Sequence, residues 1–254
     1  MAVNERFLIS IGATHPWNVA GVGVDACVAY EYGLLHAVAL VGVTAQDEQG
    51  LHAAFALPAT VVREQLRSLP SHRAAIHAGV LFDRENLLEV AHFLKAQATV
   101  PLVVDPVFAD TFGSDFSDDQ TVEAFRTAML PLRSVLTPNL PEAERLLDRD
   151  ISNVEAMVDA ARALQARGPH AVLLKGGHLA GDPVDVLASD ESVELFSDPR
   201  LPHEMRGTGC MLAAALACEL ARERSLVEAV VGARAYVRRY LSGASRIFWK
   251  HSRQ

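Results

Sequence analysis

The feature that most constrains the fold of this chain is a regular alternation between short apolar segments and longer amphipathic ones. Strands are expected in the apolar segments at 7–13, 36–46, 74–79, 101–107, 134–138 and 171–177. Helices are expected between and after them, at 20–33, 58–69, 84–97, 119–130, 141–148, 152–167, 208–223 and 226–242. Strands that alternate with helices form a mostly parallel sheet covered on both faces. The sequence therefore predicts an α/β fold, a three-layer αβα sandwich with a mostly parallel central sheet.

The region before the last two helices has a different pattern. The segments VDVLAS (184–189) and SVELFS (192–197) flank Asp190 and Glu191, which is typical of a β-hairpin. No linker, repeat or low-complexity tract interrupts the sequence. Because the chain has 254 residues, 50% of them hydrophobic, it can bury one large core. We therefore expect residues 1–254 to form a single domain.

Composition argues against several classes of function. The formal net charge of −8 argues against general nucleic-acid binding. No apolar stretch approaches the ~20 residues that a membrane span needs, and the first residues do not resemble a signal peptide. The cysteines Cys27, Cys210 and Cys218 form no CxxC pair, and the 10 histidines show no metal-ligand spacing. These features favour a reduced, cytoplasmic protein that acts on a small molecule, without nucleic acid or membrane.

Polar residues follow the ends of several expected strands. Asp105 follows PLVV, Thr137 and Asn139 follow SVL, and Lys175 follows AVLL, while Gln46 ends the second strand. Ligands of open parallel sheets bind at the carboxyl ends of the strands. The sequence therefore predicts a binding site at this edge of the sheet.

The run Gly207-Thr208-Gly209-Cys210 leads directly into an apolar helix. Glycines allow a tight turn, and a helix start offers unpaired N–H groups and a positive dipole end, which suit a phosphoryl group. We expect the pKa of Cys210 to be lowered there, so that its thiolate can accept a proton from an attacking hydroxyl group. The alternative is an ordinary helix start with an inert cysteine.

The other strand-end residues also allow two interpretations. Lys175 can neutralise phosphate charge, or it can be a surface lysine before a loop. Asp105 and Glu142 can hold Mg²⁺. Asn139 and Pro141 are good helix-start residues, which offers a purely structural explanation of that segment.

These signals together match the pattern of a known family. The motifs are TAQ (44–46), DPV (105–107), LTPNLPEAERLL (136–147), VLLKGGHL (172–179), VDVL (184–187) and GTGCMLAAALA (207–217). In these motifs the chain resembles the hydroxymethylpyrimidine/phosphomethylpyrimidine kinases of thiamine biosynthesis, which belong to the ribokinase-like superfamily. The resemblance extends from about residue 7 to about residue 240. The resemblance implies a ribokinase-like fold, ATP and Mg²⁺ as cofactors, a pyrimidine substrate and a homodimer.

The resemblance also implies roles for individual residues. Gly207, Thr208 and Gly209 would form an anion hole with Cys210, the catalytic base, and Lys175 would neutralise the transferring phosphoryl group. The ATP phosphates and magnesium would be served by Asp105, Asn139 and Glu142, with Asp105 and Glu142 as the metal ligands. The substrate side would consist of Gln46, which hydrogen-bonds the aminopyrimidine, with Gly12, Asp25 and Val107.

The substrate side departs from the family pattern. Residues 12–25 read GATHPWNVAGVGVD, which keeps Gly12, Ala20, Gly21 and Asp25 but lacks the family's early aspartate, Ser-Gly-Gly and glutamine. His15 and Trp17 are bulky newcomers in this segment. Val80 replaces a usual methionine, Arg206 replaces a histidine, and the family's glycine-rich C-terminal ending is absent. The substrate is therefore less constrained by the motifs than the reaction type.

Three functions follow from these observations. The first is ATP-dependent phosphorylation of hydroxymethylpyrimidine, its monophosphate or both, with the substrate hydroxyl attacking the γ-phosphate. The second is a pyridoxal-type vitamin B6 kinase of the same fold, which the altered segment with Trp17 motivates. The third is a non-catalytic pyrimidine-binding paralogue, which the missing Ser-Gly-Gly and C-terminal motif motivate.

Overall fold

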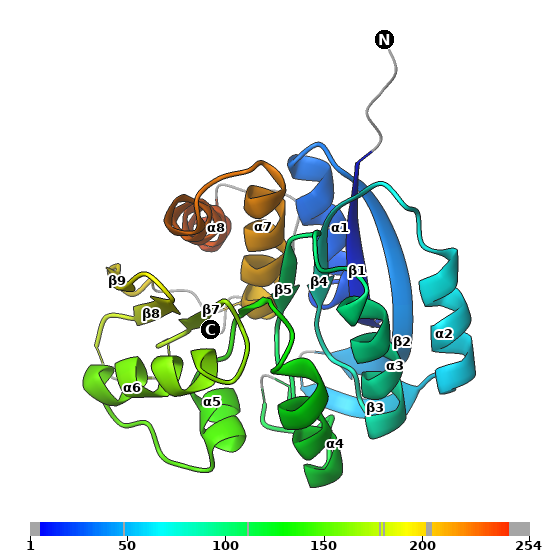
Figure 1. The fold of residues 1–254 in the computed structure, drawn as a ribbon, viewed down its shortest axis with the longest axis horizontal. Coiled ribbons are helices and arrows are strands. Elements are labelled where there is room, and N and C mark those ends of the chain that lie inside the picture. The colour runs from blue at the N-terminus through cyan, green and yellow to red at the C-terminus, as the bar shows by residue number, and fades with distance from the viewer. Residues whose placement is uncertain are drawn as a thin grey trace.

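A single nine-stranded sheet runs through the molecule in the order β3-β2-β1-β4-β5-β6-β7-β8-β9 (Figure 1). The computed structural model describes residues 6–47, 49–110, 112–177, 179, 181–201 and 205–243. Its strands are β1 (Phe7–Thr14), β2 (Leu35–Asp47), β3 (Gly50–Ala56), β4 (Arg73–Ala78), β5 (Leu102–Val104), β6 (Val135–Leu136), β7 (Ala171–Leu174), β8 (Val184–Ser189) and β9 (Val193–Ser197). Strands β2, β1, β4, β5, β6 and β7 are parallel, and β3, β8 and β9 join the edges in antiparallel pairing.

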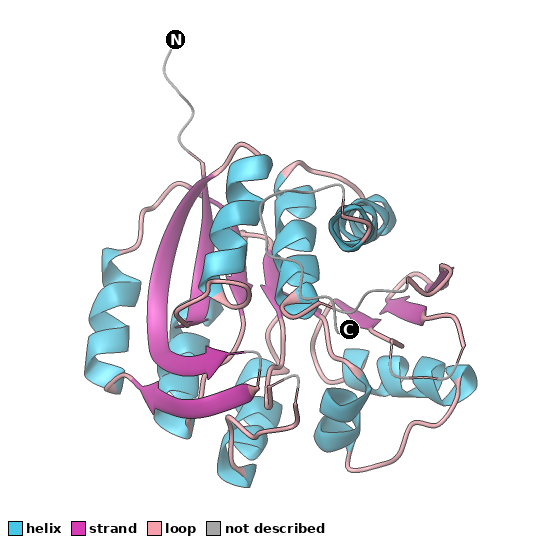
Figure 2. Ribbon diagram, turned by 180° about the vertical axis from the view of Figure 1, so that it is seen from behind, coloured by secondary structure: helices cyan, strands magenta, loops and turns pink. Residues whose placement is uncertain are grey.

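Helices cover both faces of this sheet (Figure 2). They are α1 (Val22–Glu31), α2 (Ala59–Ser68), α3 (Arg84–Lys95), α4 (Asp119–Ala124), the π-helix η1 (Phe125–Met129), α5 (Leu140–Leu147), α6 (Val154–Gln165), α7 (Thr208–Ala221) and α8 (Leu226–Leu241). Buried side chains of α2 to α6 form one core cluster with the sheet, and those of α1, α7 and α8 form another. The predicted αβα sandwich is therefore confirmed.

Strand β1 shows why both faces need helices. Leu8 points into the cluster with α1 and α7, whereas Ile9 and Ile11 point into the opposite cluster with α2 and α3. All three side chains are at most 1% exposed. Successive side chains of a strand point to opposite faces, so a continuous apolar run fits only a strand that is covered twice.

One strand was absent from the sequence prediction. Residues Gly50–Ala56 form β3, which pairs in antiparallel fashion with the end of β2, from Gly42 opposite Ala56 to Asp47 opposite Gly50. Its sequence is rich in alanine, which has low strand propensity, so tertiary pairing rather than local preference makes it a strand. The predicted hairpin at 184–197 is confirmed as β8 and β9. The helix expected at 119–130 begins as α4 and continues as η1.

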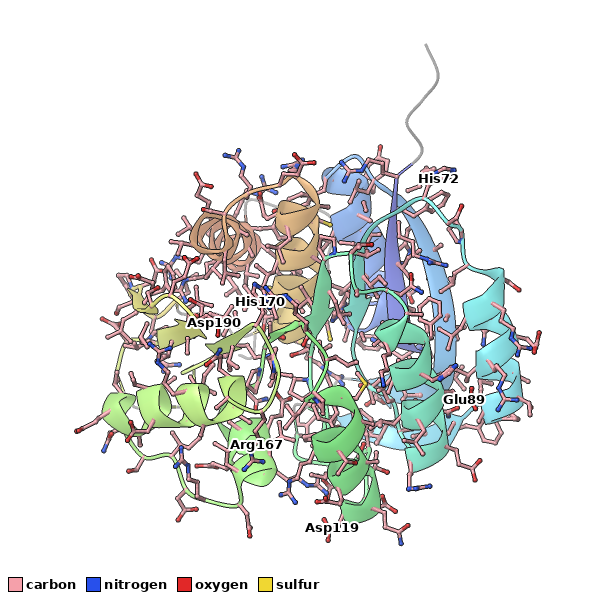
Figure 3. The ribbon with its side chains drawn as sticks, in the orientation of Figure 1. His72, Glu89, Asp119, Arg167, His170 and Asp190 are labelled. Carbon is pink, nitrogen blue, oxygen red and sulfur yellow. The ribbon has the colours of Figure 1, made fainter. Side chains whose placement is uncertain are left out.

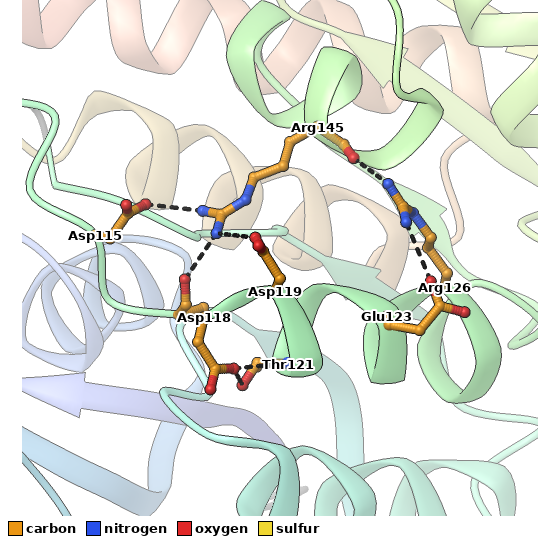
Figure 4. Close-up of polar contacts among 8 residues, drawn as sticks. Asp115, Asp118, Asp119, Thr121, Glu123, Arg126 and Arg145 are labelled. Atoms are coloured by element: carbon orange, nitrogen blue, oxygen red, sulfur yellow. Dashed lines mark hydrogen bonds and ion pairs between the residues drawn. The ribbon is translucent and has the colours of Figure 1, made fainter.

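Arginines fix α5 against the segment that precedes α4 and against η1 (Figure 4). The guanidinium of Arg145 contacts Asp115 at 2.8 Å and donates to the carbonyl oxygen of Ser117 at 2.9 Å. Arg126 donates to the carbonyl oxygen of Arg145 at 2.5 Å. These contacts hold α5, and with it the helix start that carries Asn139 and Glu142, in a fixed position.

A surface groove of about 470 Å³ lies between α3 and α4. Its lining consists of Arg84, Leu88, Asp119, Gln120, Glu123, Ala124 and Thr127. Figure 3 labels Asp119 on α4 and Glu89 on α3, both in the outer helical layer. None of the predicted site residues lines this groove.

Candidate active site

The turns before α1 and α7 each contain a glycine that no other residue can replace without movement. Gly207 has φ +77°, and a Cβ there would lie 2.0 Å from the carbonyl oxygen of Val19. Gly21 has φ +60°, and its Cβ would lie 2.2 Å from the carbonyl oxygen of Ala13. The end of β1, the start of α1 and the start of α7 are thereby packed against one another. Residues 207–210 stay half-buried, so the turn is not sealed inside the core.

Helix α7 owes its position to an apolar surface on all sides. Its side chains from Met211 to Cys218 are buried, and they lie in the cluster that also contains α1 and α8. A helix that is apolar all round belongs in a core. Cys210 stands in the first turn, as predicted, at the point where this buried helix meets the edge of the sheet.

Lys175 and Asp105 meet at that edge. The ammonium Nζ of Lys175 donates to Asp105 Oδ1 at 3.0 Å, and the hydroxyl of Thr137 donates to the same oxygen at 2.9 Å. The Asp105 side chain is 2% exposed and that of Lys175 is 15% exposed. Burial lowers the pKa of Lys175, but Asp105 and Glu142 raise it and outweigh burial. Lys175 is therefore an ammonium ion at neutral pH.

Gly209 brings this pair to the mouth of α7. A Cβ on Gly209 would lie 3.3 Å from Lys175 Nζ and 3.7 Å from Asp105 Oδ2. The Lys175 ammonium and the second Asp105 oxygen thus face the glycine turn directly. The strand-end residues and the helix start, which lie far apart in the sequence, converge as the sequence predicted.

Asn139 and Glu142 form a reciprocal cap at the start of α5. The backbone N–H of Glu142 donates to Asn139 Oδ1 at 2.9 Å, and the backbone N–H of Asn139 donates to Glu142 Oε2 at 2.7 Å. The structural interpretation of this segment is therefore correct. Burial, together with the charge of Asp105 and against that of Lys175, raises the pKa of Glu142 to about 8. Glu142 must therefore lose a proton before it can bind a metal ion.

The donor set at this edge fits a magnesium ion. Asp105 Oδ2 faces the glycine turn, and Glu142 lies close enough for the Asp105 charge to raise its pKa. Mg²⁺ is commonly held by one or two carboxylates together with substrate phosphates and water. In the described ranges, no three His, Cys, Asp or Glu side chains form a cluster that could hold a metal by themselves. The two carboxylates need a phosphate ligand or water to complete a site.

The expected lowering of the Cys210 pKa is wrong. Burial is the largest influence, and with the charges of Asp105 and Asp25 it raises the pKa of the thiol to about 12. The backbone hydrogen bond from Gly21 and the charge of Lys175 act in the opposite direction but are weaker. The sequence-based expectation included the effect of the helix start. It did not include Asp105 and Asp25, because they approach Cys210 from distant parts of the chain. Cys210 is therefore a thiol at neutral pH.

The substrate-side residues occupy different surroundings. Gln46 is half-buried at the end of β2, and Val107 is half-buried beside the core. A Cβ on Gly12 would make an ordinary 3.6 Å contact with Val22. Asp25 is 2% exposed, and the ring nitrogen Nδ1 of His77 lies 2.8 Å from its Oδ2. Asp25 therefore has a partner inside the protein, beneath the predicted site.

Two further residues support the site and were not singled out as site residues from the sequence. Asp185 on β8 accepts a hydrogen bond from the backbone N–H of Gly176 at 3.0 Å. Arg234 on α8 forms an ion pair with the other oxygen of Asp185. Asp185 lies within the VDVL motif, which was the available signal, while nothing in the sequence links Arg234 to Gly176. His178 of the KGGH run lies outside the described residues.

A lysine, two carboxylates and a glycine-rich helix start at the edge of a ribokinase-like sheet define an α/β phosphotransferase. None of the helices in the described ranges combines the length and apolar composition that crossing a bilayer requires. The chain belongs to the phosphomethylpyrimidine kinase family, whose model matches residues 16–252. The resemblance seen in the motifs is thereby confirmed, and the protein is a kinase.

Two curated relatives illustrate the match. Hydroxymethylpyrimidine/phosphomethylpyrimidine kinase of Streptomyces coelicolor is 35% identical over 238 residues, which are 92% of this chain and 88% of that protein. The thiamine biosynthesis bifunctional protein ThiED of Geobacter sulfurreducens is 34% identical over 234 residues. The match covers 91% of this chain but 48% of the bifunctional protein.

Solved structures agree with the fold. Phosphomethylpyrimidine kinase from Clostridium difficile aligns with a TM-score of 0.80 at 25% identity, over 92% of this chain and 99% of that one. The pyridoxal kinase from Staphylococcus aureus in complex with AMP-PCP and pyridoxal aligns with a TM-score of 0.84 at 26% identity, over 96% and 91%. Both kinds of vitamin kinase therefore share this architecture.

Proposed function

We propose that this kinase transfers the γ-phosphate of ATP to hydroxymethylpyrimidine, to its monophosphate or to both. The observation that carries the proposal is the position of Lys175 and Asp105 against Gly209, in the first turn of α7. The first N–H groups of a helix have no partner within the helix. This places a fixed positive charge and hydrogen-bond donors at one point, as phosphoryl transfer requires. Relatives named as hydroxymethylpyrimidine/phosphomethylpyrimidine kinases support the pyrimidine substrate.

Each residue of the edge has a distinct task in this proposal. The N–H groups of Gly207 to Cys210 bind phosphoryl oxygens, and the Lys175 ammonium compensates their charge. Asp105 and Glu142 hold Mg²⁺, which when bound neutralises part of the ATP phosphate charge. Thr137 fixes one Asp105 oxygen by its hydrogen bond, so that the other oxygen keeps its direction toward the turn.

Cys210 is proposed as the base for the hydroxymethyl substrate alone. A thiol whose pKa is raised to about 12 loses its proton only rarely at neutral pH. Asp105 is one of the two charges that raise this pKa, and a cation held by Asp105 offsets that charge. A phosphate monoester has a second pKa of about 6 and is ionised already, so a monophosphate acceptor needs no base.

A coupled assay of ADP release tests the function. Hydroxymethylpyrimidine, its monophosphate and pyridoxal are supplied in parallel with MgATP, and turnover of a pyrimidine above that of pyridoxal is expected. The Lys175→Ala variant is the inactive control, and Lys95→Ala on the exposed surface of α3 is the matched control that stays active. Absence of pyrimidine turnover by protein that still binds ATP would contradict the proposal.

A second candidate is phosphorylation of pyridoxal. The similarity to the pyridoxal kinase of Staphylococcus aureus, with a TM-score of 0.84, favours it. The altered segment 12–25 also favours it, because Trp17 stands there and is 40% exposed. Pyridoxal turnover that clearly exceeds pyrimidine turnover in the same assay would establish this function instead. A homodimer is proposed for either function, from the family resemblance.

A further inference from the structure

Arg206 joins three segments beside the predicted substrate site. It precedes the glycine turn of α7, and its Nη2 donates to Gln46 Oε1 at 2.5 Å. Its Nη1 donates to the backbone carbonyl oxygen of Asp47. The guanidinium carbon also lies 5.2 Å from the ring centre of Phe112, in a cation–π contact. The side chain is therefore held by three contacts and has little freedom to turn away.

The other end of the Gln46 amide is held as well. Its Nε2 donates to the Thr44 hydroxyl oxygen at 2.6 Å, from two residues earlier on the same strand. A glutamine amide can usually be turned over to exchange its oxygen and nitrogen. Arginine carries donors only, so the atom that faces Arg206 must be the oxygen. Arg206 therefore fixes the orientation of this amide, and the Thr44 hydroxyl, which can donate or accept, pairs with the nitrogen at the other end.

A locked amide presents a fixed pattern to a ligand. After these contacts, Oε1 retains one lone pair and Nε2 retains one hydrogen. A ligand edge fits if it places a donor at Oε1 and an acceptor at Nε2. The amidine edge of a 4-aminopyrimidine has this pattern, since its amino group donates and the adjacent ring nitrogen accepts. A 4-oxopyrimidine in its lactam form has the reverse pattern, with an acceptor outside the ring and a donor within it.

We propose that Arg206 is a positioning residue that locks the Gln46 amide and so selects an aminopyrimidine over an oxopyrimidine of the same shape. The inference rests on the proposed function and on the family resemblance, which implies that Gln46 hydrogen-bonds the aminopyrimidine. With Arg206 present, turning the amide over would bring its NH₂ group against the guanidinium, donor against donor. An oxopyrimidine could form both hydrogen bonds with the locked amide only if its own ring were turned over in the site. That would carry its hydroxymethyl group to the other side of the ring, away from Lys175.

Binding measured by titration calorimetry tests this lock without depending on turnover. The ligands are 4-amino-5-hydroxymethylpyrimidine, its 4-oxo analogue and the monophosphate of the amino compound. The wild-type protein is expected to bind the amino compound at least about tenfold more tightly, as a mispaired hydrogen bond to a fixed group requires. In Arg206→Leu and Arg206→Gln, the amide is free to turn, so the ratio of the two Kd values is expected to fall toward about one. Arg206→Lys supplies donors only and is expected to keep most of the ratio.

Controls separate this role from a merely structural one. Thr44→Val removes the acceptor at the other end but leaves Arg206 in place, so the preference for the amino compound is expected to persist. Arg222→Leu removes an exposed arginine that stacks on Tyr32, and it is expected to leave both Kd values unchanged. Thermal melting of every variant shows whether it is folded. If Arg206→Leu does not fold, Arg206→Gln and Arg206→Lys still give the comparison.

The possible outcomes are distinguishable. An unchanged ratio in folded Arg206→Leu and Arg206→Gln overturns the lock while leaving the proposed function intact. A loss of affinity confined to the monophosphate, with the amino-to-oxo ratio unchanged, also overturns it and assigns Arg206 to the substrate phosphate. If the wild-type protein binds neither pyrimidine, the proposed function is refuted, and so is the proposal that Arg206 locks the Gln46 amide.

Discussion

The Lys175 ammonium lies 3.0 Å from the Asp105 carboxylate, a contact that joins the ends of β7 and β5 across β6. Thr137, at the end of β6, donates to the same carboxylate oxygen. Three successive strands of the sheet thus contribute one side chain each to a single polar cluster. Because the cluster faces Gly209, the charge of Lys175 is held where the proposed phosphoryl transfer takes place.

Lys175→Met is expected to reduce kcat by about 10²–10³-fold, the loss that follows removal of one charge-stabilising donor. Methionine keeps the length and apolar stem of lysine but removes the ammonium. The KM for the pyrimidine is expected to change little, since Lys175 faces the phosphoryl side. Steady-state kinetics with Lys95→Met as the exposed control checks this. A large rise in KM with an unchanged kcat would contradict the assignment.

Cys210→Ser is expected to affect the two phosphorylation steps differently. Removal of a general base costs about 10²–10⁴-fold, so phosphorylation of the hydroxymethyl compound is expected to fall by that factor. Phosphorylation of the monophosphate needs no base and is expected to fall far less. Assays with each acceptor separately check this, with Cys27→Ser as the control. Equal losses for both acceptors would remove Cys210 from its proposed role.

The raised pKa of Cys210 also predicts the pH dependence of the first step. The pKa of the thiol is about 12, so the thiolate fraction rises with pH throughout the accessible range. The rate with the hydroxymethyl compound is therefore expected to increase by up to about tenfold per pH unit from pH 7 to 9. With the monophosphate acceptor the rate is expected to be nearly flat above pH 7. A flat profile for both acceptors would exclude proton removal by Cys210 as the limiting step.

The sequence predicted the convergence of the site because that convergence follows from the fold class. Once parallel strands were recognised, Asp105, Thr137 and Lys175 had to lie at one edge, since each follows a strand of the same sheet. The apolar helix after Cys210 likewise required a buried helix whose start faces that edge. These inferences use local pattern and topology alone.

What the sequence could not predict depends on long-range contacts. His77 lies within an apolar strand, and nothing nearby indicates that Asp25, 52 residues away, meets its ring. The sign of the Cys210 shift depends on burial and on the approach of Asp105 and Asp25, which local sequence does not contain. The contact between Arg206 and Gln46 spans 160 residues. Strand β3 was missed for a similar reason, since pairing with β2 outweighs its alanine-rich sequence.

Glu142→Gln is expected to stabilise the ligand-free protein while impairing its use of magnesium. The pKa of Glu142 is raised from 4.5 to about 8, so the folded state retains a proton that the unfolded state releases. The wild-type protein therefore loses stability as pH rises from about 4.5 to about 8, whereas glutamine stays neutral throughout. Urea unfolding at pH 5 and pH 8 is expected to show an advantage of the variant that grows with pH.

Two comparisons sharpen this prediction. Glu123→Gln, on the exposed surface of α4, is expected to show no such dependence on pH. Metal ligands must be deprotonated, so the wild-type enzyme is expected to need less Mg²⁺ at pH 8 than at pH 6.5, and Glu142→Gln is expected to need more at both. A variant with a normal Mg²⁺ requirement would leave Asp105 as the sole carboxylate of the proposed site.

Asp25→Asn is expected to destabilise the protein by about 3 kcal/mol, because it leaves the partner of a buried ion pair without its counter-charge. Both side chains of the pair are at most 3% exposed. Burial lowers the pKa of His77, but the charge and hydrogen bond of Asp25, together with the charge of Asp105, outweigh burial, so the net shift is upward. A group with a raised folded-state pKa contributes stability that is complete below its unfolded pKa of 6.5 and is lost as pH rises through the folded value. The loss caused by Asp25→Asn is therefore expected to be larger at pH 6 than at pH 9.

Urea unfolding at both pH values measures this difference, with Glu89→Gln as the control at an exposed ion pair with Arg63. That control is expected to have little effect at either pH, since exposed pairs are screened by solvent. Asp25 was also expected to bind substrate, and the kinetics of the folded variant separate the two roles. If the pair of Asp25 and His77 is purely structural, the KM for the pyrimidine is expected to be unchanged in the folded variant. A raised KM in the fully folded variant would show that Asp25 also acts on the ligand. An equal loss of stability at both pH values would contradict a charged His77.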